Sequence, residues 1–239
     1  MKISQIPLSL LISLLTFSCA SVERIARHDF NSNYFRLKTE GDESRSIYAD
    51  IAGDSITIYP VIYEGNRKQP DTSHPVSFNL INVKTGDNFY RSTFVRKSID
   101  VDLSTILFKF RPERQGVPRQ LNFNLNGVIY TGLRRDFFKI TPYKSPLNVE
   151  TSFINHIGFD AGVFAGIGTT PINPTVTLNK IDQEYDGLVL QKGIAAFITF
   201  GNFSIGLACG FDNLLDKNKS VWIYNQKPYL GIVIGIANF

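Results

Sequence analysis

The sequence contains few of the residues that carry most protein chemistry. Only two of its 239 residues are cysteine, which excludes a disulfide-stapled scaffold and a zinc site of four cysteines. Charged residues make up 19% of the chain, and no dense basic run or zinc-finger spacing predicts nucleic acid as a partner. Phosphate-binding loops, nucleotide fingerprints and the nucleophile elbow of hydrolases are also missing. We therefore expect no cofactor, no metal and no catalytic residue.

The chain is instead rich in apolar and aromatic residues. Hydrophobic residues make up 43% of it, with 19 Phe, 10 Tyr and 18 Gly. This composition excludes a disordered chain, and it shows no collagen-like or coiled-coil repeat. The sequence therefore predicts a folded protein with a large apolar surface that must be removed from water.

The first 20 residues predict a secretory signal peptide. Met1 and Lys2 give a short basic start, and the apolar run 6–17 is too short to span a bilayer as a helix. Two processing routes stay open. Cleavage after Ala20 fits the preference of signal peptidase for small residues, whereas the stretch 16–19 resembles a lipobox in which Cys19 would be lipidated.

The C-terminal half alternates between two kinds of residue with a period of two, which indicates strands with two distinct faces. In 203–211, one face holds Phe203, Ile205, Leu207, Cys209 and Phe211, and the other holds Ser204, Gly206, Ala208 and Gly210. A soluble sheet ordinarily places polar residues on its outer face, yet 194–211 contains no Lys or Glu. The pattern favours strands that contact lipid, with central strands of a large soluble sheet as the alternative.

The alternation defines a set of expected strands. Six lie in the C-terminal part, at 99–110, 121–133, 155–168, 188–200, 203–213 and 229–239. Because single-chain barrels have at least about eight strands, we add candidates at 54–63 and 76–83, although Pro60 and Pro75 weaken both. We expect an all-β fold, an antiparallel transmembrane β-barrel of about eight strands with a polar N-terminal lead-in, and we assign 98–239 to the barrel. Residues 21–97 supply either its first strands or a small periplasmic β-domain.

The connections predict which end of such a barrel faces which side. Gly201-Asn202 suits a two-residue hairpin, whereas 169–186 and 214–227 are long and polar. Short periplasmic turns that alternate with long extracellular loops are typical of outer-membrane barrels. Aromatic residues near the two ends predict membrane girdles, and these are Phe200, Phe203, Trp222, Tyr224, Tyr229 and Phe239.

The final stretch 227–239, which ends in Ile236-Ala237-Asn238-Phe239, resembles the closing strand of Gram-negative outer-membrane β-barrel proteins. The resemblance is at the level of the class and covers roughly 99–239. It implies location in the cell outer membrane and contact with outer-membrane lipid and lipopolysaccharide. It also implies insertion by the barrel-assembly machinery, which reads a terminal aromatic residue.

Polar residues on the other faces of the strands predict a lumen, and the candidates are Asn122, Asn124, Asn126, His156 and Asp160. His156 and Asp160 share one face of a strand but lie about 13 Å apart along it, which is too far for a hydrogen bond. No catalytic pair follows from them.

Three functions remain open. The first is a non-enzymatic barrel with a structural, adhesive or ligand- or partner-binding role through its extracellular loops. The second is a lipoprotein subunit that contributes four strands to an oligomeric secretion or export channel, in which the partner is another copy or an envelope protein. The third and least favoured is a lipid-modifying enzyme that uses His156.

Overall fold

The computed structural model describes residues 30–39, 43–80, 91–201 and 203–236. Its strands are β1 (Asn33–Lys38), β2 (Arg45–Ala52), β3 (Ser55–Glu64), β4 (Arg67–Pro70), β5 (Val76–Asn79), β6 (Thr93–Arg111), β7 (Gln120–Asn122), β8 (Asn126–Lys144), β9 (Glu150–Ile172), β10 (Tyr185–Phe200), β11 (Phe203–Leu214) and β12 (Pro228–Ile236). All strand pairings in this part of the chain are antiparallel, so the prediction of an all-β fold is confirmed. No helix among these residues is long and apolar enough to cross a membrane.

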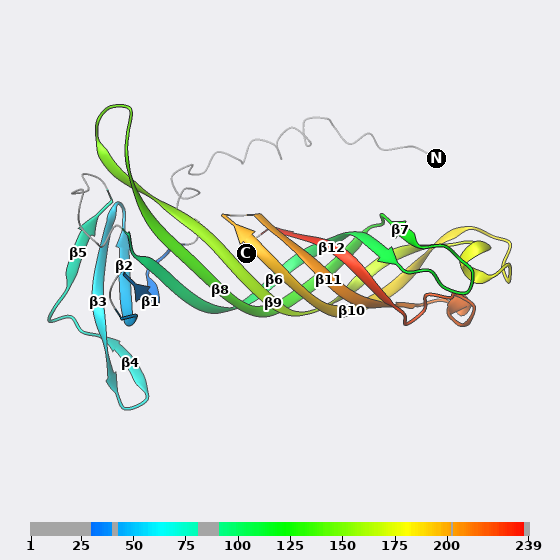
Figure 1. The fold of residues 1–239 in the computed structure, drawn as a ribbon. Helices are drawn as coiled ribbons and strands as arrows, with labels where there is room; N and C mark the ends of the chain where they lie inside the picture. The colour runs from blue at the N-terminus through cyan, green and yellow to red at the C-terminus, as the bar shows by residue number, and fades with distance from the viewer. Residues whose placement is uncertain (1–29, 40–42, 81–90, 202, 237–239) are drawn as a thin grey trace, which may run out of the picture.

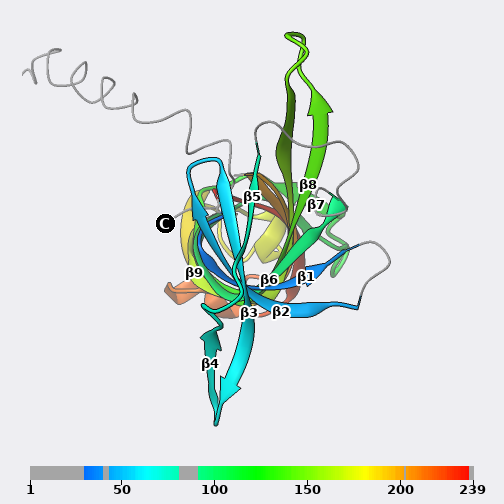
Figure 2. The same ribbon diagram turned by 90° about the vertical axis from the view of Figure 1, so that its left-hand side faces the viewer.

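Six strands pair in a series that returns to its first member. The order is β6, β8, β9, β10, β11 and β12, and β12 pairs in turn with β6. We call these six strands the ring; Figure 1 shows them wound around a common axis, and Figure 2 shows them from one end. The registers are long, as in β8 and β9, which pair from Asn126 with Gly168 to Lys144 with Glu150.

The expected count of about eight strands is wrong, because the sheet has 12 strands. The strands predicted at 54–63 and 76–83 exist as β3 and β5, but they lie outside the ring. They belong to a second group, the N-terminal sheet, in which β1, β2 and β3 follow one another from the edge of β6. Along that edge, β6 pairs with β1 over 93–95 and with β12 over 104–110, which is how one strand serves both groups.

Proline marks a change of partner rather than the end of a strand. Pro60 lies inside β3, which pairs with β5 over 55–58 and with β4 over 61–64. Pro60 therefore falls between the ladders with β5 and β4, and it stands opposite Ile47 at the end of the ladder with β2. The predicted strand 121–133 is interrupted, because β7 and β8 are separated by 123–125 while both pair with β6.

The described residues form three separate apolar cores. The core of the N-terminal sheet includes Phe30, Phe35, Ile47, Phe94 and Phe138. The interior of the ring holds Ile106, Val128, Tyr130, Phe164, Ala195, Phe197, Ala208, Tyr229 and Val233. A third core, which includes Val176, Leu214 and Trp222, lies among the connections 112–119, 173–184 and 215–227. We call that side of the molecule the loop end; it lies opposite the N-terminal sheet in Figure 1.

Candidate functional site

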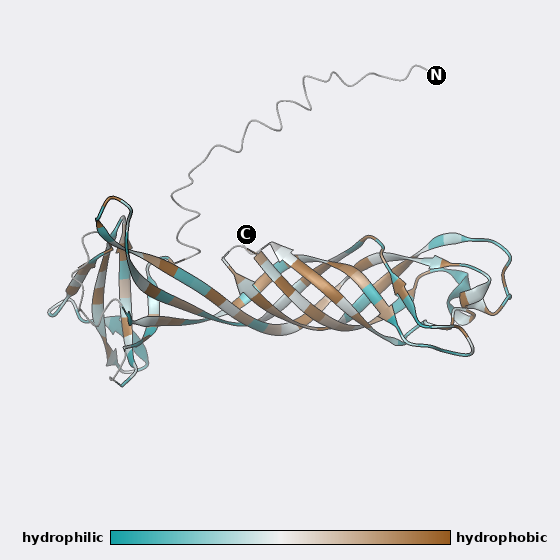
Figure 3. Ribbon diagram, turned by 45° about the horizontal axis from the view of Figure 1, so that its top comes forward, coloured by the Kyte–Doolittle hydropathy of each residue, from teal (hydrophilic) through white to brown (hydrophobic). Residues whose placement is uncertain are grey.

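The outer face of the ring is apolar over most of its length. Large exposed side chains include Ile99, Val101 and Leu103 on β6, Ile129 and Leu133 on β8, Phe159, Val163 and Ile167 on β9, Leu190, Ile194 and Ile198 on β10, Ile205 and Leu207 on β11, and Leu230 and Ile232 on β12. Figure 3 shows hydrophobic positions recurring along these strands, with hydrophilic ones gathered at the loop end. An apolar surface this continuous is rare on soluble monomers and marks contact with protein or membrane. We call it the apolar band.

The interior of the ring is filled by side chains. The Phe164 ring occupies the space over Gly193 and Gly210, where an added Cβ would come within 2.8 Å of the ring. Phe197 packs edge-on against Tyr130, with 4.8 Å between ring centroids. The inward glycines therefore make room for aromatic rings, and the described residues leave a packed core inside the ring.

His156 and Asp160, which were predicted to face a lumen, are both buried inside, and they form hydrogen bonds to different partners. Nε2 of His156 lies 2.8 Å from Oδ1 of Asp136, a carboxylate that also accepts hydrogen bonds from Arg96 and Arg134. The imidazole stacks on Phe138, with 4.6 Å between the ring centroids. Because Phe138 belongs to the core of the N-terminal sheet, this cluster joins that sheet to the ring.

Asp160 instead accepts a hydrogen bond from the Tyr130 hydroxyl. In the described structure, His156 forms hydrogen bonds with Asp136 and with the carbonyl oxygen of Gly201. No group of three His, Cys, Asp or Glu residues that could hold a metal ion occurs among the residues described. The Asp136 carboxylate is thus paired with arginines, and the Asp160 carboxylate is hydrogen-bonded to a tyrosine hydroxyl.

Of the asparagines predicted to line a lumen, Asn126 is buried and satisfied by its neighbours. Its Nδ2 donates to the carbonyl oxygens of Ile106 and Asn124 at 3.1 and 2.7 Å, and its Oδ1 accepts from Gln191. Asn122 and Asn124 are half-buried around the break between β7 and β8. Asn126 thus stabilises the irregular start of β8.

The aromatic girdle prediction is wrong for three residues. Trp222, Tyr224 and Tyr229 are 3%, 1% and 1% exposed, so none of them faces outward. Their rings surround the Arg111 guanidinium, at 5.1, 5.4 and 5.6 Å from its carbon to the three ring centroids. Cation–π attraction to a buried guanidinium draws them inward.

Two other girdle candidates do face outward. Phe200 and Phe203 are each 53% exposed beside the turn between β10 and β11. This position is the one that a girdle requires, but the girdle itself stays a prediction. Phe239 and the lipidation candidate Cys19 lie outside the described residues.

A buried charge cluster sits beneath the loop end, and the sequence analysis missed it. Asp212 is fully buried and accepts hydrogen bonds from Lys109 Nζ at 2.9 and 3.1 Å and from Arg111. The ammonium of Lys109 also lies 4.7 Å from the centroid of Tyr229. The one available signal was the pair of cations at alternate positions 109 and 111 near the end of an apolar strand.

The loop end also carries a cationic pocket of 410 Å³. Its lining includes Arg114, Lys180, Lys219 and Lys227 and no acidic residue. The pocket lies beside Tyr224, whose burial raises the pKa of its phenol while Arg111 and Arg114 act in the opposite direction. These cations come from three separate connections, so sequence reasoning could not group them. The pocket suits an anion, because it gathers positive charge with no internal counter-charge.

Comparison with models of protein families, with curated proteins and with solved structures finds no match for this chain.

Proposed function

We propose that the protein is a non-enzymatic outer-membrane β-barrel that binds an anionic ligand at its loop end. The observation that carries the proposal is the apolar band. It surrounds a ring in which each of the six strands pairs with a ring strand on both sides, because β12 pairs with β6. Exposure of that band to water would be costly, whereas exposure to lipid would not. Internal pairing of strands is also what a membrane demands of any spanning sheet.

The orientation follows from the distribution of connections. The connections of the loop end lie opposite the N-terminal sheet and the end of β10 at Phe200. Long loops on outer-membrane barrels face outward and short turns face the periplasm. We therefore place the loop end at the cell surface and the N-terminal sheet in the periplasm.

The cationic pocket gives the loop end its binding role. Four basic side chains in a lining that contains no acidic residue attract phosphate or carboxylate groups. Lipopolysaccharide phosphates are the nearest such groups at the proposed location. A role in adhesion or structure would use the same surface.

The sharpest test of membrane insertion compares two leucines. Leu207 on β11 is 72% exposed in the apolar band, and Leu147 is 86% exposed at the tip of the β8–β9 hairpin. In a barrel, Leu207→Arg places a charge on the lipid face and costs about 2–4 kcal/mol at the bilayer midplane. Leu147→Arg lies outside the bilayer and is expected to be neutral.

The measurement is the fraction of full-length protein that folds into phospholipid vesicles, scored by a band that shifts on heating in a semi-native gel. We expect Leu207→Arg to reduce this fraction strongly and Leu147→Arg to leave it unchanged. Equal folding of both variants, or folding of the wild type in buffer without lipid, would remove the membrane proposal.

The two alternatives receive less support from the geometry. A four-strand contribution to a shared barrel requires free edges on β9 and β12, but these edges pair with β8 and β6 of the same chain. A lipid-modifying enzyme on His156 requires a reactive partner, but the imidazole lies against Asp136 and Phe138 inside the molecule.

A further inference from the structure

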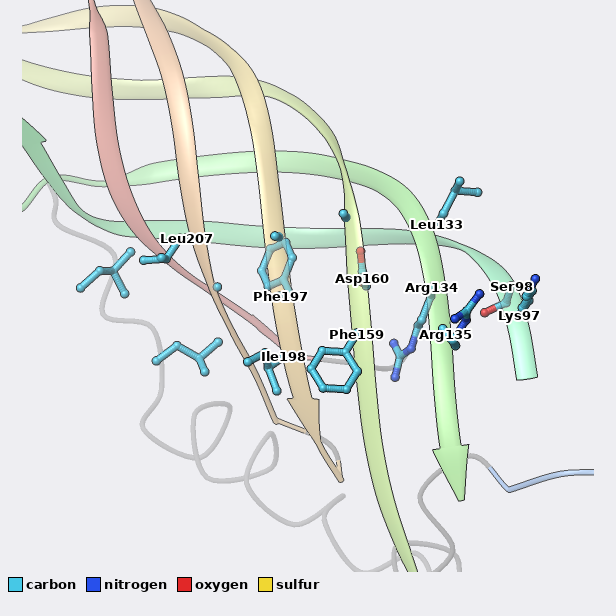
Figure 4. Close-up of a pocket in the computed structure, with 15 residues that line it drawn as sticks. Lys97, Ser98, Leu133, Arg134, Arg135, Phe159, Asp160, Phe197, Ile198 and Leu207 are labelled. Carbon is cyan, nitrogen blue, oxygen red and sulfur yellow. The ribbon is translucent and has the colours of Figure 1, made fainter. Parts of the chain in front are cut away.

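An apolar groove of 940 Å³ lies on the outer face of the ring, and its lining includes Leu133, Phe159, Ala161, Ala196, Ile198 and Leu207. In one register row, Ala161 and Ala196 stand between Leu133 and Leu207. Because two small side chains lie between two large ones, the apolar band has a depression at this row. Figure 4 shows Lys97 and Arg135 toward one end of the groove, with Leu133 beside them, and Ile198 and Leu207 toward the other end.

A second groove, of 390 Å³, lies on the side of the N-terminal sheet. Five of its lining residues are basic, namely Arg36, Lys38, Lys68, Lys97 and Arg135, and none is acidic. A concave surface of this kind holds a strongly positive potential.

The two grooves share Lys97 and Arg135. These two residues stand directly opposite each other on β6 and β8, an arrangement that like-charge repulsion makes unfavourable. Neither takes part in an ion pair between described residues, whereas the adjacent Arg134 is paired with Asp136 and Asp100. The geometry therefore provides two exposed cations at the junction of an apolar groove and a basic one.

We propose that this junction binds one anionic phospholipid, with its phosphate between Lys97 and Arg135 and an acyl chain over Ala161 and Ala196. An amphiphile with an anionic headgroup matches both grooves, because its headgroup suits the basic groove and its apolar tail suits the apolar groove. The acidic residue that lines the apolar groove, Asp160, already accepts a hydrogen bond from Tyr130.

The proposal rests on the proposed membrane location, which also selects phospholipid over lipid A. The junction lies toward the N-terminal sheet and away from the loop end. In the orientation given above, that is the periplasmic leaflet, where phospholipid is the anionic amphiphile.

The test uses native mass spectrometry of the full-length protein in a neutral detergent. Phosphatidylglycerol and phosphatidylcholine with identical acyl chains are added in separate titrations, and lipid A is added in a third. We expect the wild type to retain phosphatidylglycerol preferentially. Each basic side chain near an anionic lipid contributes about fivefold in affinity, so K97Q/R135Q should bind phosphatidylglycerol about 25-fold more weakly.

Two matched variants distinguish binding at this specific site from non-specific attraction of anionic lipid to basic residues. K139Q/K144Q removes two charges from exposed positions of β8 outside both grooves and should leave phosphatidylglycerol binding unchanged. Ala196→Phe fills the apolar groove and should weaken both phospholipids, and glycerol phosphate without acyl chains should not compete. Equal losses of phosphatidylglycerol in the two double variants, or a loss of lipid A in K97Q/R135Q as large as that of phosphatidylglycerol, would overturn the proposal.

The heat-shifted gel band is checked for every variant before lipid is added. A wild type that lacks this band defeats the membrane proposal itself. A wild type that folds in vesicles yet does not discriminate between the two phospholipids defeats the lipid site alone.

Discussion

At the scale of single residues, the interior of the ring is organised by carboxylates that each serve several cations. Asp212 is the clearest case, because it lies in a fully buried position between Lys109 and Arg111. A buried ion pair contributes little net stability relative to a well-packed apolar core, but the loss of one partner leaves an uncompensated charge. Neutralisation of Asp212 would therefore leave Lys109 and Arg111 as buried cations without a counter-charge, at a cost in stability.

We expect Asp212→Asn to lower the free energy of unfolding by about 3–5 kcal/mol, because two buried cations would lose their carboxylate. The measurement is a urea titration of the detergent-solubilised protein followed by circular dichroism. Asp182→Asn, at an exposed position of the loop end, provides the control and should change little. Addition of Lys109→Met to the Asp212→Asn variant should recover part of the loss, and no recovery would argue against charge as the cause.

At the scale of elements, the sequence predicted the strands of the ring better than the positions of its side chains. The expected segments 188–200 and 203–213 correspond closely to β10 and β11, because strict alternation of residue types reveals a strand and its two faces. The sequence could not predict that β8 and β9 extend into the core of the N-terminal sheet, because alternation does not indicate which core a strand enters. The inward turn of Trp222 was equally hidden, since it depends on Arg111, more than a hundred residues earlier in the chain.

The close approach of β8 and β9 depends on glycines, of which Gly162 and Gly166 leave the least room for a Cβ. A Cβ on Gly162 would lie 2.0 Å from the carbonyl oxygen of Thr131 and 2.4 Å from the Cα of Gly132, both backbone atoms that cannot rotate away. Overpacking of this kind typically costs about 1–3 kcal/mol. We therefore expect Gly162→Ala to lower the urea midpoint of unfolding.

The matched control for that variant is Gly127→Ala, also on a ring strand, where an added Cβ meets nothing within 4 Å. A midpoint at or above that of the wild type is expected for it, since alanine also reduces the freedom of the unfolded chain. If both variants behaved alike, the contact between β8 and β9 would not be as close as the structure has it.

At the scale of the whole molecule, the ring behaves as a rod with a solid centre rather than as a tube. Aromatic and aliphatic side chains fill it between the two charge clusters of Asp136 and Asp212. Small barrels have interiors only wide enough for their own side chains. We therefore expect such a protein to display its two ends, the cationic pocket on one and the N-terminal sheet on the other, and to pass nothing between them.

This property gives a prediction about conductance. We expect the purified protein, reconstituted in planar bilayers, to give no stepwise current at any voltage that the bilayer tolerates, and to keep the mass of one chain in detergent. A general porin inserted into the same bilayers serves as the positive control. Current steps from single chains would contradict the filled interior, because Phe164 and Phe197 would then have to leave the centre of the ring. Current steps from a multimer would instead favour the shared channel, and would require the pairing of β12 with β6 to open so that each edge meets another copy.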